Sequence, residues 1–242
     1  MNGPALPNLA LRALAAYGGR ERWAEAQSVR ATLSVGGVAL LAKGCLPLRH
    51  VPVAAELAFP RIRIDGLAGE NTVAWLEGGS TRLATHPGQT LAARGDARAG
   101  FRNPRRLLWW DRLDASYFVG YTLWNELTFP RLLLRPDLDW AELNETTLKA
   151  RFPSGLPTHC EEQIFRFDPG SGLLRRHEYT ADVFGSWARV VTVVLKHREW
   201  DGIMCACRCI TTPGRAGGKR LQWPVLWSSE IHAWRLSGAP LI

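Results

Sequence analysis

Apolar and polar residues alternate along several short segments of the chain, beginning with residues 28–35. In the sequence SVRATLSV, apolar side chains occupy every second position from Val29 to Val35. A period of two predicts a strand with one buried face. Four later segments, separated by Pro or Gly, have the same character: 51–59, 61–65, 72–77 and 81–86. The first half of the chain is therefore expected to be mainly an antiparallel meander.

Two segments have a helical pattern instead. The first begins at Asn8, which suits an N-cap, and ends at the next Gly-Gly pair. The second lies within residues 107–130, LLWWDRLDASYFVGYTLWNELTFP, where Asp111 or Asp114 can cap a helix that ends before the final proline. Residues 87–106, which precede it, are rich in Gly and Arg and predict a mobile crossing segment.

Strand patterns return in the second half of the chain. The predicted strands are 138–143, 147–152, 160–167, 173–181, 188–200, 203–212 and 221–236. The DPGSG sequence at 168–172 and the Asp201-Gly202 pair are turn signals between two pairs of them. About ten strands against two or three helices predict a mainly β (α+β) fold. We expect one curved antiparallel sheet, a half-barrel, with a helix on its concave face and a short N-terminal helix, in a single domain over residues 1–242.

The composition predicts a large apolar core and also a cellular location. The chain is 46% hydrophobic and contains 11 Trp. Arg12 interrupts the short apolar run near the N-terminus, so we expect no export signal, and no segment is apolar enough for a membrane span. The five cysteines are an odd number in a chain that needs no disulfides for stability, which favours reduced thiols. These features together predict a cytoplasmic protein.

The net charge of +8 permits an anionic partner. The basic residues are mostly Arg and are scattered singly or in pairs, with no basic run and no DNA-reading module, so we expect no nucleic-acid partner. The chain also lacks the nucleotide-binding, hydrolase, kinase and zinc-protease sequence motifs, and we expect no cofactor.

The order of these elements resembles the half-barrel fold of the bacterial lipoprotein carrier and localisation proteins and of the violacein-pathway enzyme VioE. The phrase FRFDPGSGLLRRHEY is part of that resemblance. The segments RRLLWWDRLDASYFVGYTLWN, FDPGSGLLRRHEYTADVFGSWARV and HREWDGI also resemble uncharacterised bacterial proteins. The resemblance implies the half-barrel fold. It does not imply the carrier role in the periplasm, because that role requires an export signal.

His177 and Tyr179 form the candidate catalytic pair. They point to the same face of a predicted strand, and if that face is concave they could act as acid and base on a ligand, with Asp182 or Arg189 supplying charge. The alternative is that both fill the edge of the core with their polar tips in water. His197 has the same two interpretations, and we include it with Arg189 among the candidate substrate-binding residues.

Aromatic residues mark the predicted central helix. Leu113, Tyr117, Tyr121 and Trp124 share one helical face, and Trp109 and Trp110 precede it. The simplest interpretation is a helix that packs its apolar face on the sheet. The alternative is that these aromatic residues form one wall of a ligand pocket in the half-open sheet, with the wall opposite including His177 and Tyr179.

Cys205, Cys207 and Cys209 alternate along a predicted strand and therefore share one face. Strand geometry separates their sulfurs, so we expect three buried apolar side chains, no metal and no disulfide among them.

Two functional hypotheses follow. The first is a cofactor-independent enzyme of small-molecule biosynthesis, a cyclase, isomerase or lyase whose apolar or aromatic substrate, carboxylate-bearing in view of the Arg-rich walls, binds in the groove. The second is a non-catalytic carrier or sequestering protein for a lipid or hydrophobic metabolite. The sequence does not fix the oligomeric state.

Overall fold

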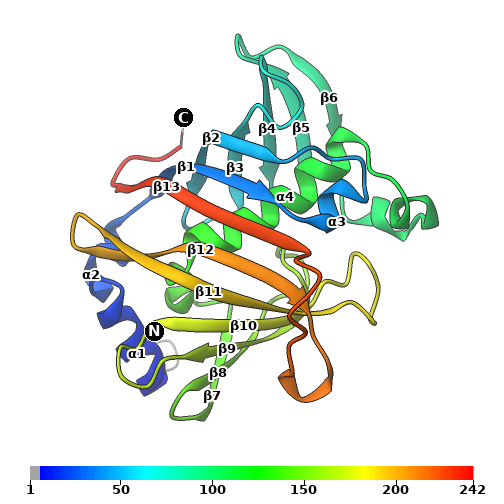
Figure 1. Cartoon of the computed structure of the whole chain (residues 1–242). Coiled ribbons are helices and arrows are strands. Elements are labelled where there is room, and N and C mark those ends of the chain that lie inside the picture. The colour runs from blue at the N-terminus through cyan, green and yellow to red at the C-terminus, as the bar shows by residue number, and fades with distance from the viewer. Residues whose placement is uncertain (1–5, 242) are drawn as a thin grey trace.

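The computed structural model describes residues 6–241 and contains one antiparallel sheet of 13 strands. Its order is β6-β5-β4-β3-β2-β1-β13-β12-β11-β10-β9-β8-β7. Consecutive strands are therefore neighbours except β6 and β7, which form the two edges, and the first and last strands, β1 and β13, pair in the middle. Figure 1 shows the sheet bent around a central helix. The expected curved antiparallel sheet with a helix on its concave face is confirmed. Residues 1–5, part of the segment on which the export expectation rests, lie outside the described residues.

The strands are β1 (Ser28–Gly36), β2 (Leu48–Glu56), β3 (Arg61–Asp65), β4 (Thr72–Glu77), β5 (Ser80–Thr85), β6 (Thr90–Arg94), β7 (Asp139–Asn144), β8 (Thr147–Arg151), β9 (Glu162–Phe167), β10 (Leu174–Thr180), β11 (Arg189–Trp200), β12 (Ile203–Pro213) and β13 (Trp227–Ser237). The α-helices are α1 (Asn8–Ala16), α2 (Arg20–Glu25), α3 (Val38–Leu41) and α4 (Arg112–Thr128). Short 3₁₀ turns are η1 (Ala99–Arg102), η2 (Pro104–Leu107), η3 (Arg131–Leu134) and η4 (Ala216–Gly218).

Local sequence explains the β11–β12 hairpin. Asp201 and Gly202 both have positive φ, 52° and 74°. This is the backbone conformation that a two-residue hairpin turn requires and that an Asp-Gly pair adopts readily. The turn fixes the register, and alternate residues of β12 then point into the core.

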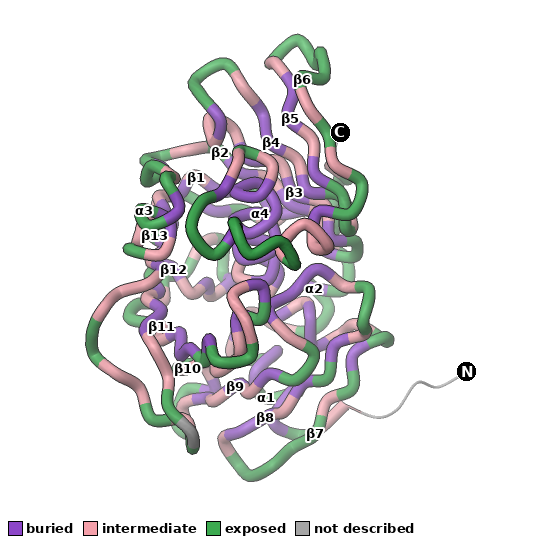
Figure 2. The backbone as a smooth tube through the Cα atoms, turned by 90° about the vertical axis from the view of Figure 1, so that its right-hand side faces the viewer, coloured by how far each residue is buried: buried purple, intermediate pink, exposed green. Residues whose placement is uncertain are grey.

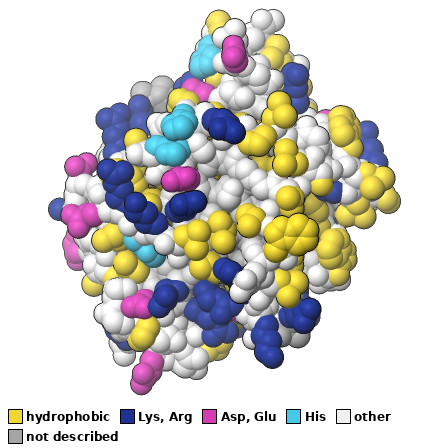
Figure 3. Space-filling model, viewed as in Figure 1, with side chains coloured by type: hydrophobic (Ala, Val, Ile, Leu, Met, Phe, Trp, Pro, Cys, Tyr) yellow, Lys and Arg dark blue, Asp and Glu magenta, His cyan; other side chains and the backbone are white. Residues whose placement is uncertain are grey.

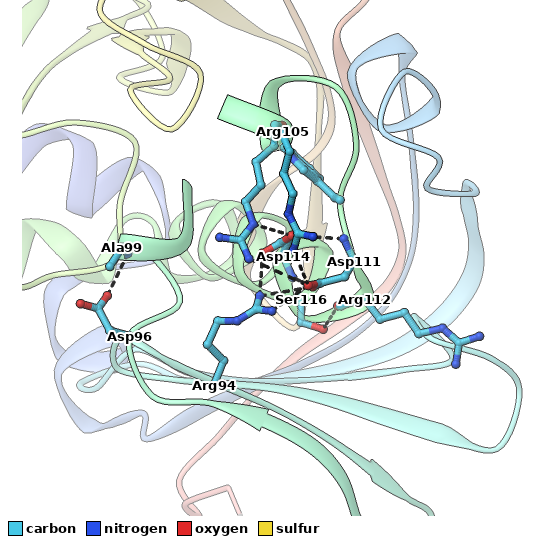
Figure 4. A network of polar contacts seen from close by, with 10 residues as sticks. Arg94, Asp96, Ala99, Arg105, Asp111, Arg112, Asp114 and Ser116 are labelled. Carbon is cyan, nitrogen blue, oxygen red and sulfur yellow. Dashed lines mark hydrogen bonds and ion pairs between the residues drawn. The ribbon is translucent and has the colours of Figure 1, made fainter. Parts of the chain in front are cut away.

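Helix α4 begins at a charged cap. Asp111 is the N-cap, and its side chain and that of Asp114 form a reciprocal capping box with the backbone. Arg94 of β6 contacts both carboxylates, at 2.7 Å and 2.6 Å (Figure 4). Arg106 contacts Asp114 at 2.7 Å. The Asp114 side chain is fully buried, so these cations compensate a charge that has left water. The cap attaches the start of α4 to the edge strand β6.

Helix α4 packs against strands β2 to β5 along most of its length. Figure 2 shows it as a buried segment inside the curved sheet. Gly120 permits the close approach, because a Cβ at this position would lie 2.9 Å from Cβ of Leu76. The close packing places α4 over the first half of the sheet, and two cavities remain between the helix and strands β9 to β13.

Two local expectations were wrong. The segment 87–106 is not an irregular crossing, since it contains β6, whose pairing with β5 depends on neighbours that the local composition does not reveal. Residues 221–226 do not belong to the last strand, which starts at Trp227. After β1 the chain turns at Gly37 into the short helix α3, whose first amides donate to the carbonyls of Val225 and Leu226.

Among residues 6–241, no helix has the length and apolarity needed to cross a membrane.

We predict that Gly120→Ala destabilises the protein by about 1–3 kcal/mol, because the new methyl group would overlap the Leu76 side chain close to its backbone. Alanine has a higher helix propensity than glycine, by about 1 kcal/mol, so helix propensity alone would make this substitution stabilising. Urea unfolding measures the difference. Gly79→Ala is the matched control, because no heavy atom lies within 4 Å of the new Cβ, and its stability should change by less than about 1 kcal/mol. Equal effects of the two substitutions would contradict the packing argument.

Candidate functional site

A cavity of about 400 Å³ lies beside α4, between the helix and the second half of the sheet. We call it the outer cavity. Its walls come from α3 and the residues that follow it, from α4, from the β10–β11 connection and from the adjoining ends of β12 and β13. The lining is mainly apolar and includes Phe118, Phe184, Leu226 and Trp227. This size and chemistry are typical of a small-molecule site.

A second, smaller cavity of about 40 Å³ lies deeper between α4 and strands β9 to β12. We call it the inner cavity. His159 and Tyr179 line both cavities, so they stand between the two spaces. His177 and Glu126 line the inner cavity alone. The inner cavity is where most titratable side chains of the concave face gather.

Helix α4 presents Phe118 and Thr122 to the outer cavity and Asn125 and Glu126 to the inner one. The sequence interpretation chose a different face. Tyr117, Tyr121 and Trp124 line neither cavity and are almost fully buried. The Trp124 indole donates to the carbonyl of Glu56 in β2 at 2.7 Å, and Tyr121 packs edge-on against His159 at 5.1 Å between ring centres. These aromatics therefore belong to the packing of α4, as the simpler interpretation expected.

His177 is held by its neighbours. Its Nε2 lies 2.6 Å from Oε1 of Gln163, and its ring stacks on Phe165 with centres 4.3 Å apart. The Gln163 amide nitrogen donates to Thr158 and to the carbonyl of Cys160, so its oxygen is free to accept from an Nε2 hydrogen. Burial lowers the pKa of His177 to about 3. The imidazole is therefore neutral and positioned as a hydrogen-bond donor to Gln163.

Tyr179 joins a chain of hydroxyl groups on the sheet. Its OH lies 3.2 Å from Thr192, which lies 2.7 Å from Thr211. Its ring stacks on His159 with centres 3.7 Å apart. Burial raises the pKa of Tyr179 well above its usual range. His177 and Tyr179 thus share the concave face and line the inner cavity together, as the predicted strand geometry required.

Glu126 is the titratable group that the sequence analysis missed. Trp227 donates its indole N–H to Oε1 of Glu126 at 2.9 Å. Burial raises the pKa of Glu126 to about 7, with hydrogen bonds from Ser229 and Trp227 opposing the shift. A Glu in an amphipathic helix is usually on the solvent side. Only the position of α4 inside the curved sheet shows that this one faces a cavity.

Two polar atoms in the cavity walls have no hydrogen-bond partner among the described residues. They are Nδ1 of His159 and Oγ1 of Thr122, and both residues are at least 97% buried. Burial lowers the pKa of His159 well below its usual range, so the ring is neutral. An unpaired polar atom costs free energy in the interior, and a bound ligand that hydrogen-bonds to it removes that cost.

Two basic side chains complete the outer cavity. Lys43 is 8% exposed, lies 5.6 Å from the centre of the Phe184 ring and donates to the carbonyl of Leu107. Desolvation lowers its pKa. Arg189 is exposed at the start of β11. No carboxylate of the described residues pairs with either.

The other candidate residues lie apart from the cavity surfaces or behind them. Trp110 is buried and stacks on Phe184, behind the outer cavity. Trp109 is 52% exposed at the molecular surface. His197 lies on β11 with Nε2 3.1 Å from the hydroxyl of Tyr17, and lines neither cavity. Asp182 forms an ion pair with Arg98 at 2.6 Å.

The three alternate cysteines of β12 are buried, as expected for apolar side chains. All five cysteines are free thiols. Burial raises the pKa values of Cys205, Cys207 and Cys209, which removes the thiolate character that a nucleophile needs. Within the described part of the chain, no group of three or more His, Cys, Asp or Glu side chains is arranged to hold a metal ion.

Comparison with solved structures supports the fold. The chain is similar to the LolA superfamily protein NE2245 from Nitrosomonas europaea, with a TM-score of 0.53, 8% identity, and coverage of 98% of this chain and 96% of the other. It also matches a DUF1329 family protein from Desulfovibrio piger (TM-score 0.48, 12% identity, coverage 95% and 90%). A third match is a putative outer membrane lipoprotein-sorting protein domain from Vibrio parahaemolyticus (0.46, 10%, 89% and 89%).

No family model matches the chain, and no curated protein matches it significantly. At 8% identity the first of these matches, with its TM-score of 0.53, supports the LolA-like half-barrel fold alone. The resemblance to VioE and the local sequence phrases stay expectations.

We predict a pH-dependent difference between the wild-type protein and Glu126→Gln. Folding raises the pKa of Glu126 from about 4.5 to about 7, so the folded state holds a proton that the unfolded state releases. The contribution of Glu126 to stability is therefore fully present below pH 4.5 and is lost as the pH rises through 7. Glutamine keeps the shape without the charge. The free energy of unfolding of Glu126→Gln, relative to that of wild type, should therefore be about 2–3 kcal/mol higher at pH 8.5 than at pH 5.

Urea unfolding at the two pH values measures this change. The control is Glu145→Gln, which alters an exposed glutamate in the β7–β8 turn and should show almost no pH-dependent difference from wild type. If both variants follow the wild-type curve, Glu126 does not carry a raised pKa in the folded protein.

Proposed function

We propose that the protein is a non-catalytic carrier or sequestering protein for a hydrophobic small molecule of the lipid class, held in the outer cavity. The observation that carries the proposal is an apolar cavity of about 400 Å³ with two unpaired polar atoms in its walls, inside a half-barrel. One structural neighbour, with a TM-score of 0.53, is a LolA superfamily protein, and this similarity supports the carrier hypothesis over the enzyme hypothesis.

The cavity walls define the kind of ligand. Phe118, Phe184 and Trp227 offer flat apolar surfaces to an aliphatic or aromatic body. His159 and Thr122 offer single hydrogen-bonding atoms inside the cavity. A ligand of this site is thus mostly apolar, with one or two hydrogen-bonding groups that fix its orientation.

Lys43 and Arg189 indicate that the ligand also carries an anionic group. Both line the outer cavity, and neither is paired with a carboxylate among the described residues. A buried cation without a counterion is poorly compensated, and a carboxylate on the ligand would supply the missing partner. We therefore extend the proposal to a carboxylate-bearing amphiphile such as a fatty acid.

The enzyme hypothesis has weaker support. An acid or base for catalysis works best when its pKa is close to the ambient pH, whereas the pKa of His177 is lowered to about 3 and its Nε2 is already engaged with Gln163. Glu126 is the exception, because it lines the inner cavity with a pKa of about 7. A cofactor-free isomerase or cyclase remains the second candidate, with Glu126 rather than His177 as its proton-transfer group.

The cytoplasmic location is also a proposal. Its support is the set of five free thiols in the structure. Fractionation of cells that express the intact gene would test it.

We predict that the purified protein binds dodecanoate and decanol, and that Lys43→Gln weakens dodecanoate binding by roughly 10-fold to 100-fold, which corresponds to the loss of one hydrogen bond to a charged group. Decanol binding should change little, because the alcohol has no charge to pair. Isothermal titration calorimetry measures both affinities.

Two variants sharpen the experiment. Lys196→Gln removes an exposed lysine outside both cavities and should leave both affinities unchanged. Ala42→Trp places a large side chain at an exposed position on the cavity wall and should abolish binding of both compounds while the melting temperature is kept. Failure of the wild-type protein to bind either compound would exclude a carrier of single-chain amphiphiles.

A further inference from the structure

One end of the molecule exposes an unusual number of large apolar side chains. Of the 13 large hydrophobic residues that are exposed in the described part of the chain, eight belong to four segments: 37–47, 99–110, 181–189 and 214–226. We call these eight side chains the rim. The most exposed members are Leu46, Leu108, Trp187 and Trp223, at 82%, 78%, 76% and 78%.

The four segments lie together because of strand register and loop contacts. Gly36 pairs with Ser228, Val190 with Pro213, and Thr180 with Arg189, so three of the segments leave the sheet at the same end. The fourth segment joins them where the amide of Trp110 bonds to the carbonyl of Lys43. Figure 3 shows the hydrophobic side chains gathered on the right-hand side of the molecule.

The rim surrounds the outer cavity. Val38 and Trp187 belong to the rim and also line the cavity, and Leu107 accepts a hydrogen bond through its carbonyl from Lys43 in the cavity wall. The opening of the cavity and the exposed apolar surface are therefore parts of one face.

Charge on this face is strongly one-sided. The four segments contain eight Lys and Arg residues and one acidic residue, Asp182. Two of the eight, Arg105 and Arg106, contact carboxylates of the α4 cap. Asp182 is paired with Arg98, which lies outside these segments. Arg102, Arg215 and Lys219 are exposed and have no carboxylate partner among the described residues. Dark blue basic side chains accordingly border the yellow ones in Figure 3.

We propose that the rim docks on a lipid bilayer that contains anionic headgroups. Exposed Trp and Leu side chains enter the boundary between headgroups and acyl chains, where Trp is particularly stable. The surrounding Arg and Lys residues bind the anionic surface. In this orientation the outer cavity opens toward the membrane, so that a membrane-derived amphiphile enters it without crossing water. The docking surface stands on the rim alone and does not require the cavity to be occupied.

The test is sedimentation of the intact protein with sucrose-loaded vesicles. We expect binding to vesicles of phosphatidylcholine with about one third phosphatidylglycerol to exceed binding to pure phosphatidylcholine by roughly tenfold or more, and to weaken as salt is raised. Leu108→Ser combined with Trp223→Ser should reduce the partition coefficient to anionic vesicles by roughly tenfold or more. Neither residue lines the outer cavity, so calorimetric binding of dodecanoate should be unchanged.

The matched control is Leu91→Ser combined with Leu143→Ser, two leucines that are each 54% exposed on β6 and β7 and lie outside the rim. This variant should bind vesicles like wild type. Equal vesicle binding by the rim variant and the control variant would overturn the proposal, as would the absence of wild-type binding to anionic vesicles. A concentration-dependent dimer in analytical ultracentrifugation that the rim variant abolishes would also overturn it, because a second copy of the chain would then cover the rim. Loss of dodecanoate binding alone would count against the carrier proposal and leave the docking surface intact.

Discussion

The position of the outer cavity depends on how much of the concave face of a 13-stranded open sheet one helix can cover. Helix α4 packs on β2 to β5, where Gly120 lets it approach Leu76 closely and the Asp111–Asp114 cap binds Arg94 of β6. A helix is about 10 Å wide, so it cannot fill the space up to β10–β13 as well. The outer cavity is the space that remains, and Phe118 and Thr122 line it because they lie on the side of α4 that faces away from its packing partners.

The polar residues of the concave face have two kinds of environment. One group is satisfied internally, as in the contact of His177 with Gln163 and the hydroxyl chain from Tyr179 through Thr192 to Thr211. Such networks hold side chains in one geometry. Burial moves the pKa values of His177 and Tyr179 away from neutrality. The other group, including His159 and Thr122, has unpaired atoms at the outer cavity. Binding is the role that suits unpaired groups, and this distinction favours recognition over proton transfer at His177.

The sequence predicted those features that depend on local chemistry. Strands β3 and β4, the Asp201-Gly202 hairpin and the Asp111 cap follow from alternation, turn residues and capping, and the structure confirms each of them. Features that depend on contacts between residues far apart in the sequence could not be predicted from it. The rotation of α4 is decided by its contact with Leu76, so the sequence did not show that Glu126 faces a cavity or that Tyr121 and Trp124 do not. Strand β6 was missed because its pairing partner, rather than its composition, makes it a strand.

The topology also explains why the outer cavity and the rim lie at one end of the second half of the sheet. Consecutive antiparallel strands alternate their connections between two ends. At one end the turns are tight, at 145–146, 168–173 and 201–202. At the other end the connections 152–161, 181–188 and 214–226 are longer, and they carry His159, Trp187 and Trp223. Long loops on a rigid sheet can vary in sequence without loss of the fold, which is why binding surfaces usually form on them. The outer cavity and the rim share this end because these loops contribute to both. The proposed ligand site and the proposed membrane-docking surface are therefore two consequences of the same connectivity.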